Sequence, residues 1–596
     1  MQQEKVPTVI IVGAGPGGLT LYHSLIKNKD KKEFNVKIFE RESGPKDRWQ
    51  GYHIGFKSQG FKSLMNCIPS SVALNLPKAI PNPVPGVEYH GTSFSDHEGN
   101  LLLRPPFKQF KNIYEIAEIP DRFLSGTIAY RDRLRDVLLE NVPVQWGKKL
   151  VRYEETDEGV WVNFDDGSRE FCDILVDASG INSPIRKQKI PELQINDIGT
   201  TYAVASAVVP KHLMDRLIKV NGNSVIQKLL GLNGDSTFIG LRLIPIEQEQ
   251  NFKNKNHSDE LHYRITMFYF YSSELDNEEI EKINNNPALV VEHIKNMIRK
   301  LRPECEMTNI LLELWDLVPK AVPKESEDFP FKTYNPIQLR KVRDINLLTI
   351  NSWTSSRVTL IGDAAHAMSP YLGLGTTHAI QDAEALSQAL LNYSPENYIS
   401  CIKEYENKML KRATVDVLKS RYATIKQVTP VGYFGLIIRN RGLLYIILDI
   451  VKFCYYCIRG NALYIQFGSS LVQRTPGLNG DSTFIALRLI SIEQEQNYKN
   501  ENKSECFIIE LFYLSELDIG HMSGKFGFEM EAGIDVVEVD GGGVKVKVRP
   551  NLDTGASISS DGVEAKVGGV GFKVGKVTGF STPLGNFEIN FVKMFG

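Results

Sequence analysis

The sequence predicts an α/β fold in which a parallel-sheet domain is interleaved with a mixed-sheet domain, with a C-terminal glycine-rich all-β module. A short apolar run, a glycine-rich turn and a helical pattern open the chain, and a similar combination returns near residue 360. Strand-like runs between residues 199 and 340 predict the mixed sheet. Residues 524–596 hold 15 of the 47 glycines and alternate polar with apolar side chains, which predicts the β module.

The first elements form a β-strand, α-helix, β-strand unit. Val9–Val12 is an apolar run that ends in glycines, as a buried parallel strand does. Leu19–Ile26 has the apolar spacing of a helix, and Val36–Glu40 has the composition of the next strand. The unit spans about 30 residues, the usual length of such a unit. It therefore predicts two neighbouring parallel strands joined by a helix.

The other elements can be predicted in chain order from apolar periodicity and turn residues. They are an irregular or sheet region over 67–123, a helix over Arg131–Glu140, strands over Val160–Phe164 and Ile174–Val176 around an Asp166–Gly167 turn, strands over Thr237–Ile244 and Tyr263–Tyr271, a helix over Asn284–Leu301, a strand over Arg357–Ile361, and helices over Thr377–Leu391 and Tyr398–Lys426.

The composition is that of an ordinary globular protein. The 69 Lys and Arg residues nearly balance the 71 Asp and Glu residues, so the formal charge of −2 gives no general attraction to nucleic acid. Seven cysteines in 596 residues are too few for a disulfide scaffold and suit a reducing compartment. The N-terminus lacks the basic stretch and the cleavage site of a signal peptide. We therefore expect a cytoplasmic protein with no nucleic-acid partner.

The segment after residue 425 is unusually apolar. Residues 430–458 are rich in aromatic and aliphatic side chains, but Asp449 and Lys452 interrupt the run. No stretch of about 20 apolar residues remains to span a bilayer. We expect an apolar helical segment over 426–470 that packs on the body of the protein, and peripheral membrane contact through 430–458 is the alternative.

An internal near-copy follows that segment. Residues 477–502 match residues 231–256 at 22 of 26 positions. A single copy at this distance is no solenoid repeat, because such repeats have periods of about 20–50 residues. We therefore predict that residues 471–520 are a partial duplicate of 231–276 without a function of its own, followed by the glycine-rich β module over 521–596.

The turn after the first strand, from Gly13 to Gly18, matches the pattern G-x-G-x-x-G. Gly13 permits the tight turn, Gly15 lets the backbone approach a pyrophosphate, and Gly18 permits close contact between helix and strand. The helix N-terminus adds free N–H groups for phosphates. Glu40 ends the second strand, 22 residues past Gly18, where its carboxylate can accept hydrogen bonds from a ribose. These residues predict a Rossmann-type dinucleotide site with contacts from Gly13, Ala14, Gly15, Gly18, Glu40 and the adjacent Arg41.

The second motif, Arg357–Leu386, reads RVTLIGDAAHAMSPYLGLGTTHAIQDAEAL. Its G-D-A-A-H, P-x-x-G-x-G and A-x-x-D-A parts closely resemble the second fingerprint of the group A flavoprotein monooxygenases, the para-hydroxybenzoate hydroxylase-like family. The resemblance implies FAD as the cofactor, with Asp363 on the ribityl hydroxyls and Pro370 against the isoalloxazine. Glycines allow the backbone to run beside a ring system. The cofactor contacts expected here are Asp363, Pro370, Gly373, Leu374 and Gly375.

Three further segments resemble the same family. In VDASGINSPIRKQ, Ser183 and Arg186 match the family's D-G segment, but Ser179 stands where the family usually has Asp, which leaves pyridine nucleotide binding open. RWQGYHIGFKSQGFKSL implies that Arg48 reaches the cofactor, and YRDRLRDVLL implies Arg131 as another FAD contact. At Thr377 the family often has Asn.

The resemblance covers about residues 7–425 and implies two interleaved domains. A Rossmann-type FAD-binding domain would comprise 7–66, 124–190 and 345–425. The substrate domain, over 67–123 and 191–344, is matched only by its position in the chain.

The family resemblance implies an FAD-dependent monooxygenase that uses NAD(P)H and O₂ to hydroxylate or epoxidise a small organic substrate. Leu372, Leu374 and the aromatic run Phe268–Tyr271 suggest an apolar or aromatic substrate, although a sheet core would explain the aromatic run equally well. The alternatives are a flavin-dependent reductase or dehydrogenase without oxygen insertion, and a binding protein with a relic flavin domain. Because the cofactor supplies the difficult chemistry, the sequence identifies no catalytic acid or base.

Other candidate residues carry less weight. His366 belongs to the G-D-A-A-H motif and is expected to be structural rather than a proton shuttle. Cys454 and Cys457 have redox-motif spacing but lie in an apolar run without a paired motif, so we predict no metal site.

Overall fold

The computed structural model describes residues 6–45, 47, 51–84, 86–105, 107–119, 126–248, 260–320, 337–350 and 352–431, and beyond these only the backbone of strands between 471 and 590. The chain divides into two compact units, Met1–Asn440 and Arg441–Gly596. Arg48, Cys454, Cys457 and the segment 432–470 lie outside the described residues. The predictions made for them therefore stay predictions.

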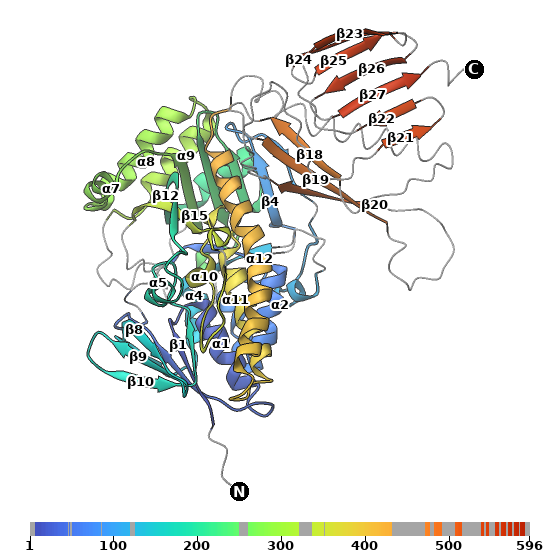
Figure 1. Ribbon diagram of the computed structural model, residues 1–596. Coiled ribbons are helices and arrows are strands. Elements are labelled where there is room, and N and C mark those ends of the chain that lie inside the picture. The colour runs from blue at the N-terminus through green and yellow to red at the C-terminus, as the bar shows by residue number, and fades with distance from the viewer. Residues whose placement is uncertain are drawn as a thin grey trace, which may run out of the picture. The chain divides into compact units, whose positions relative to one another are not determined.

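A five-stranded parallel sheet forms one half of the first unit (Figure 1). Its order is β17 (Val358–Leu360), β11 (Ile174–Asp177), β1 (Thr8–Val12), β2 (Asn35–Phe39) and β7 (Val144–Gln145), with every pair parallel. The middle strands are buried apolar runs, as expected for a sheet that helices cover on both faces. The predicted strand–helix–strand unit at the N-terminus is confirmed by the β1–β2 pairing.

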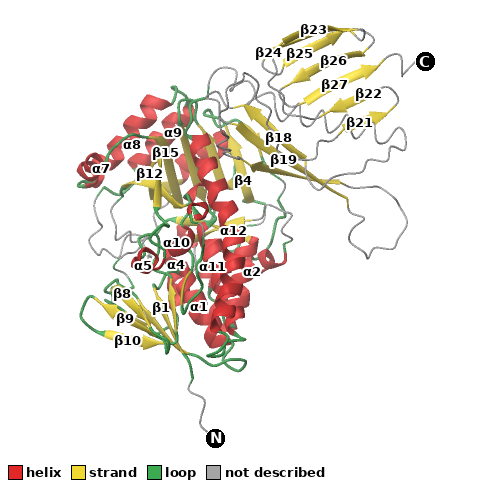
Figure 2. Cartoon of the chain, in the orientation of Figure 1, coloured by secondary structure: helices red, strands yellow, loops and turns green. Residues whose placement is uncertain are grey.

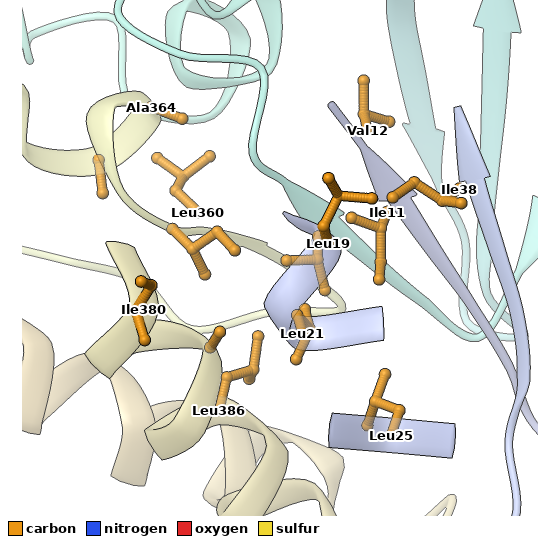
Figure 3. Close-up of a cluster of buried hydrophobic side chains, with 14 of the residues drawn as sticks. Ile11, Val12, Leu19, Leu21, Leu25, Ile38, Leu360, Ala364, Ile380 and Leu386 are labelled. Atoms are coloured by element: carbon orange, nitrogen blue, oxygen red, sulfur yellow. The ribbon is translucent and has the colours of Figure 1, made fainter. Parts of the chain in front are cut away.

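Helices pack this sheet into one core. The helices are α1 (Pro16–Lys27), α2 (Ser58–Cys67), α4 (Arg131–Leu139), α5 (Pro184–Lys189), α11 (Gly375–Leu390) and α12 (Tyr398–Gln427). Helix α1 begins with Pro at its first position, where no backbone N–H is needed. Its Leu19, Leu21 and Leu25 meet Ile380 and Leu386 of α11 (Figure 3). The first and the second sequence motifs, some 350 residues apart, are therefore joined by one apolar core.

A seven-stranded mixed sheet forms the other half. Its order is β16 (Leu339–Ile345), β12 (Ile195–Pro210), β15 (His262–Ser272), β14 (Asp235–Leu241), β13 (Ser224–Leu230), β4 (Tyr89–Ser95) and β5 (Leu101–Leu103). All pairs are antiparallel except β13 with β4. Helices α6 (Lys211–Asn221), α7 (Asn277–Asn284), α8 (Pro287–Leu301) and α9 (Glu306–Asp316) accompany it, and Figure 2 shows α7, α8 and α9 beside β12 and β15.

Smaller elements complete the first unit. They are the three-stranded sheet of β8 (Leu150–Glu155), β9 (Val160–Phe164) and β10 (Arg169–Cys172), the pair β3 (His53–Lys57) and β6 (Gly126–Tyr130), the short helices α3 (Ser70–Ala73) and α10 (Asp363–His366), and the 3₁₀ turns η1 (Leu76–Lys78), η2 (Ile113–Glu118), η3 (Ile246–Gln248), η4 (Leu347–Thr349) and η5 (Pro370–Leu372).

Three sequence predictions for this unit need correction. The Asp166–Gly167 turn joins β9 to β10, a strand that the sequence analysis missed, whereas β11 belongs to the parallel sheet. The helix expected over Asn284–Leu301 is present as α8, which starts three residues later because Asn286 caps it before Pro287, and the preceding helix α7, which ends at Asn284, was not predicted. The region 67–123 is not only irregular or sheet, since it also contains α3, η1 and η2.

The second unit is described only through strands. The strands β18 (Leu471–Pro476), β19 (Ser482–Ser491) and β20 (Phe507–Leu514) form one sheet. The pairing of Phe484 with Leu514 reproduces, at the offset of 246 residues, the pairing of Phe238 with Phe268 between β14 and β15. The near-copy thus keeps the strand register of the segment that it repeats.

The last residues contribute a second sheet of seven antiparallel strands. They are β21 (Glu538–Gly541), β22 (Val544–Lys547), β23 (Gly555–Ser559), β24 (Gly562–Val567), β25 (Val570–Val574), β26 (Val577–Thr582) and β27 (Gly585–Asn590). That 521–596 is an independent all-β module stays a prediction. Within the described residues, no helix is both long and apolar enough to cross a bilayer.

Candidate functional site

A cavity of about 1000 Å³ lies between the parallel sheet and the mixed sheet. Its walls come from the glycine turn after β1, the loop after β11, the segment from Ile361 to Ala379 and the strands β12, β14, β15 and β16. Volumes of this size hold cofactors and substrates in other proteins. The topology thus brings the two strongest sequence motifs and the mixed sheet to one place.

The glycine turn has the geometry that its sequence predicts. Gly13 has φ +112°, and a side chain there would collide with the Ala178 carbonyl after β11. A Cβ on Gly18 would collide with the Gly13 carbonyl, so both glycines are required by packing. A Cβ on Gly15 would have no atom within 4 Å. Gly15 therefore presents bare backbone to the cavity, where a phosphate can approach it.

Glu40 lies beside this turn at the end of β2. Its carboxylate accepts hydrogen bonds from the backbone N–H of Ala14 at 2.8 Å and of Glu42 at 3.2 Å, and it lines the cavity. Ala14 itself is buried and outside the lining, so its contribution is this backbone contact. Arg41 is exposed at the cavity edge.

Arg135 on α4 is a site residue that the sequence analysis missed. Its Nε donates to the Ala14 carbonyl at 3.0 Å, and its Nη2 lies 2.9 Å from the Glu42 carboxylate. It follows Arg131 by four residues, one helical turn, and that spacing is the signal that could have identified it. Arg131 lines the cavity and lies over the ring of Tyr52 at 5.7 Å.

Asp363 starts the short helix α10 and opens onto the cavity. Burial by the surrounding protein raises the pKa of its carboxyl, while His366 and Arg131 act in the opposite direction. Together with Gly15 and Glu40, it places hydrogen-bonding groups along one wall of the cavity.

The 3₁₀ turn η5 and the glycines after it form the next part of the wall. Pro370, Tyr371, Gly373 and Gly375 line the cavity, whereas Leu374 does not. Gly373 adopts a left-handed conformation with φ +65°, and a Cβ there would lie 3.4 Å from the Gly55 Cα. That Cβ contact would be ordinary, so the requirement for glycine here comes from the left-handed backbone, which other residues adopt only with strain.

The segment after β11 is organised by Asp177. Its carboxylate accepts from the Ser179 backbone N–H at 2.9 Å and from the Ser183 hydroxyl, and Ser183 in turn caps α5. Ser179 lines the cavity, and its hydroxyl lies beside the Asp177 carboxylate and hydrogen-bonds to it.

These observations fit FAD, since a dinucleotide has phosphates that can approach Gly15 and hydroxyls that can donate to Asp363. The sequence analysis predicted Gly15 and Asp363 as cofactor contacts. Among the described residues, no cluster of His, Cys, Asp or Glu could hold a metal ion.

Aromatic rings cover the mixed-sheet wall. Tyr202 and Phe270 are stacked with ring centroids 5.4 Å apart, and Phe268 lies 6.0 Å from Phe270 with nearly parallel rings. Phe238 meets Phe268 edge to face at 5.3 Å. Because side chains alternate along a strand, the predicted aromatic run is divided: Phe268 and Phe270 line the cavity, whereas Tyr269 and Tyr271 pack in the core under the helices. The wall is suited to a flat apolar ring.

His366 is buried beneath the site and contacts Asp382 of α11, with Nε2 2.7 Å from the carboxylate. Asp382 also accepts from the Gly362 N–H at 2.8 Å and pairs with Arg412 of α12. This arrangement suits the structural interpretation of His366, because its Nε2 is engaged by a carboxylate away from the cavity lining.

Lys228 on β13 is buried behind η5, and burial lowers the pKa of its ammonium group to about 7, with Lys57 acting in the same direction. In the unfolded chain a lysine titrates near 10.5. Between these values the unfolded state binds the extra proton, so the free energy of unfolding rises with pH, by at most about 1.4 kcal/mol per pH unit. Lys228→Met is expected to remove this rise, as urea unfolding of FAD-free protein at pH 6, 8 and 9.5 would measure. Identical pH dependence of the two proteins would contradict it.

Comparisons with known proteins agree with this geometry. Residues 317–417 match the FAD binding domain family. The chain is 26% identical over 430 residues to the FAD-dependent monooxygenase thnD of Trichoderma harzianum, a match covering 69% of this chain and 92% of that protein. It is 22% identical over 423 residues to 6-hydroxynicotinate 3-monooxygenase of Pseudomonas fluorescens, covering 68% of this chain and 89% of that protein.

A solved structure shares the fold. The 2,6-dihydroxypyridine-3-hydroxylase of Arthrobacter nicotinovorans matches with a TM-score of 0.53 at 16% identity, over 72% of this chain and 95% of the other.

Proposed function

We infer that this chain, a member of the FAD-dependent monooxygenase family, transfers one oxygen atom of O₂ to a small aromatic substrate at the expense of NAD(P)H. The observation that carries the substrate class is the wall of Tyr202, Phe238, Phe268 and Phe270 in the same cavity as Asp363. Two similar proteins are named for hydroxypyridine-type ring substrates, which supports the same class here.

The proposed FAD contacts follow the cavity wall. Gly13, Gly15 and Gly18 would shape the turn that binds the pyrophosphate. Glu40 and Arg41 would lie at the ribose, and Asp363 with Arg131 would reach the ribityl chain of the flavin. Pro370, Gly373 and Gly375 would border the ring, and Arg48 stays a proposal from the sequence. Leu374, outside the lining, and Ala14 would act through their backbone.

Bound FAD, once reduced, supplies the activation of O₂, and the protein supplies position and exclusion of water. The aromatic wall would stack the substrate ring and orient it toward Pro370. The proposed domains are 7–66, 124–190 and 345–425 for FAD and 67–123 and 191–344 for the substrate.

The test uses the full-length protein with its flavin. We expect a flavin absorption spectrum, and NAD(P)H oxidation that rises at least about tenfold with an aromatic substrate from a panel of phenols and hydroxypyridines. With ¹⁸O₂, the product should gain one ¹⁸O atom. NAD(P)H oxidation without labelled product would instead establish a reductase or dehydrogenase, and absence of flavin binding would favour a binding protein.

We also propose that the enzyme acts in the cytoplasm. Contact of residues 430–458 with a membrane surface is the alternative, supported only by their apolar and aromatic composition. Co-sedimentation of the full-length protein with anionic vesicles tests it, and protein that stays in the supernatant would exclude this alternative.

A further inference from the structure

Lys228 lies in an apolar part of the mixed sheet with its amine aimed at the turn η5. The residue is 6% exposed, and its Nζ donates to the Tyr371 carbonyl at 3.0 Å. The same nitrogen lies over the Tyr371 ring at 4.4 Å and the Phe94 ring at 5.6 Å. No carboxylate among the described residues lies within ion-pair distance of it, although buried cations are usually paired. The polar partner of this amine is therefore the Tyr371 carbonyl, to which it donates its hydrogen bond.

Tyr371 is held from three neighbouring strands of the mixed sheet. Lys228 on β13 binds its carbonyl, and the Ser236 hydroxyl on β14 lies 3.2 Å from its hydroxyl. Phe270 on β15 packs against its ring edge to face, with centroids 5.5 Å apart. The same turn borders the cavity through Pro370, Tyr371 and Gly373. One wall of the proposed FAD site is thus fixed from the sheet that lines the substrate side.

Burying an amine at this position costs desolvation free energy, which the hydrogen bond to the Tyr371 carbonyl offsets. A methionine would fill a similar volume without a polar atom to desolvate. Its introduction would leave the Tyr371 carbonyl without the Lys228 donor and release the turn from β13. The hydrogen bond from Lys228 therefore fixes the position of the turn η5 at the cavity, which an apolar side chain of the same volume would not do.

We propose that Lys228 is a positioning residue for FAD, which holds the Pro370–Leu372 turn against the mixed sheet so that the turn forms a fixed wall for the flavin. This inference rests on the proposed function, because it takes the Pro370 side of the turn to face the bound cofactor. Lys228 does not line the cavity, so it would act on the cofactor only through the turn.

The test measures FAD binding to the apoprotein of wild type and Lys228→Met, together with circular dichroism of the bound flavin in the visible region. We expect about tenfold weaker binding in the variant, the effect of roughly one hydrogen bond, and an altered flavin signal. Lys295→Met is the matched control, since it removes another buried ammonium group, which pairs with Asp316 and does not line the cavity, and it should change affinity less than about threefold. Unchanged affinity and unchanged dichroism in Lys228→Met would overturn the proposal.

A second measurement on the wild-type protein covers the case in which Lys228→Met does not fold. Acetylation of Lys228, followed by peptide mass spectrometry, should slow at least about threefold when FAD binds and the turn is braced, while the exposed Lys408 keeps its rate. An equal rate with and without FAD would overturn the positioning role. Failure of the wild-type apoprotein to bind FAD would instead overturn the proposed function itself.

Discussion

Replacing Gly15 with alanine is expected to weaken FAD binding at least about 100-fold while the protein remains folded. Gly15 has φ −83° and ψ 176°, which alanine adopts freely, and an added Cβ meets no protein atom within 4 Å. The methyl group would occupy the space through which a pyrophosphate approaches the N-terminus of α1. Fluorescence titration of the apoprotein with FAD measures the affinity, and urea unfolding measures the fold.

Gly18→Ala is the matched comparison, because Gly18 lies in the same turn but its added Cβ would point into protein instead of into the cavity. Its Cβ would collide with the Gly13 carbonyl, so this variant should lose stability by about 1–3 kcal/mol even without FAD. The two alanines should therefore separate cofactor binding from folding. If Gly15→Ala binds FAD as tightly as wild type, the assignment of this turn to the pyrophosphate is wrong.

Elements and motifs whose signal is local in sequence could be predicted. The apolar run before Gly13 and the spacing from Gly18 to Glu40 were sufficient for β1, α1 and β2, because the turn, the helix start and the acid act within one supersecondary unit. The second motif around Asp363 was recognised for the same reason. One boundary was misplaced: the helix expected from Asn284 starts at Pro287, where Asn286 caps it, and the short helix α7 before it was not predicted.

Contacts between distant segments could not be predicted from one sequence. Lys228 reads as an ordinary charge in a strand, and its role becomes visible only when β13 is placed behind η5, 143 residues later. Arg135 likewise reads as a helix charge until α4 packs beside the loop after β2. The side chains of β15 give another example. The sequence predicts that they alternate between two faces, but it does not say that Phe268 and Phe270 face the cavity while Tyr269 faces the core.

Asp382→Asn is expected to lower the free energy of unfolding by about 3 kcal/mol or more. The carboxylate is fully buried and contacts three groups: the Gly362 N–H before Asp363, the ring of His366 and the guanidinium of Arg412. An amide keeps the shape but removes the charge, so the fully buried position loses the carboxylate that the Gly362 N–H, the His366 ring and the 25% exposed Arg412 guanidinium all contact. Urea unfolding at pH 7 measures the loss. Asp416→Asn is the control: it also removes a carboxylate from a histidine, His378, but at a site 26% exposed, and should cost about 1 kcal/mol or less.

The same variant should change the response to acid. Burial alone would raise the pKa of Asp382, but His366, Arg412 and the Gly362 N–H together hold it below its usual value. The stabilisation from this group is therefore complete above the usual pKa of an aspartate, about 3.9, and is lost as pH falls toward the lower folded-state pKa. Asp382→Asn should flatten this acid limb, so that the difference in stability from wild type shrinks between about pH 5 and 3. A difference that stays constant over this range would show that the cost of the substitution comes from packing rather than from the charge, and that the link between α11, α12 and the Asp363 turn is not electrostatic.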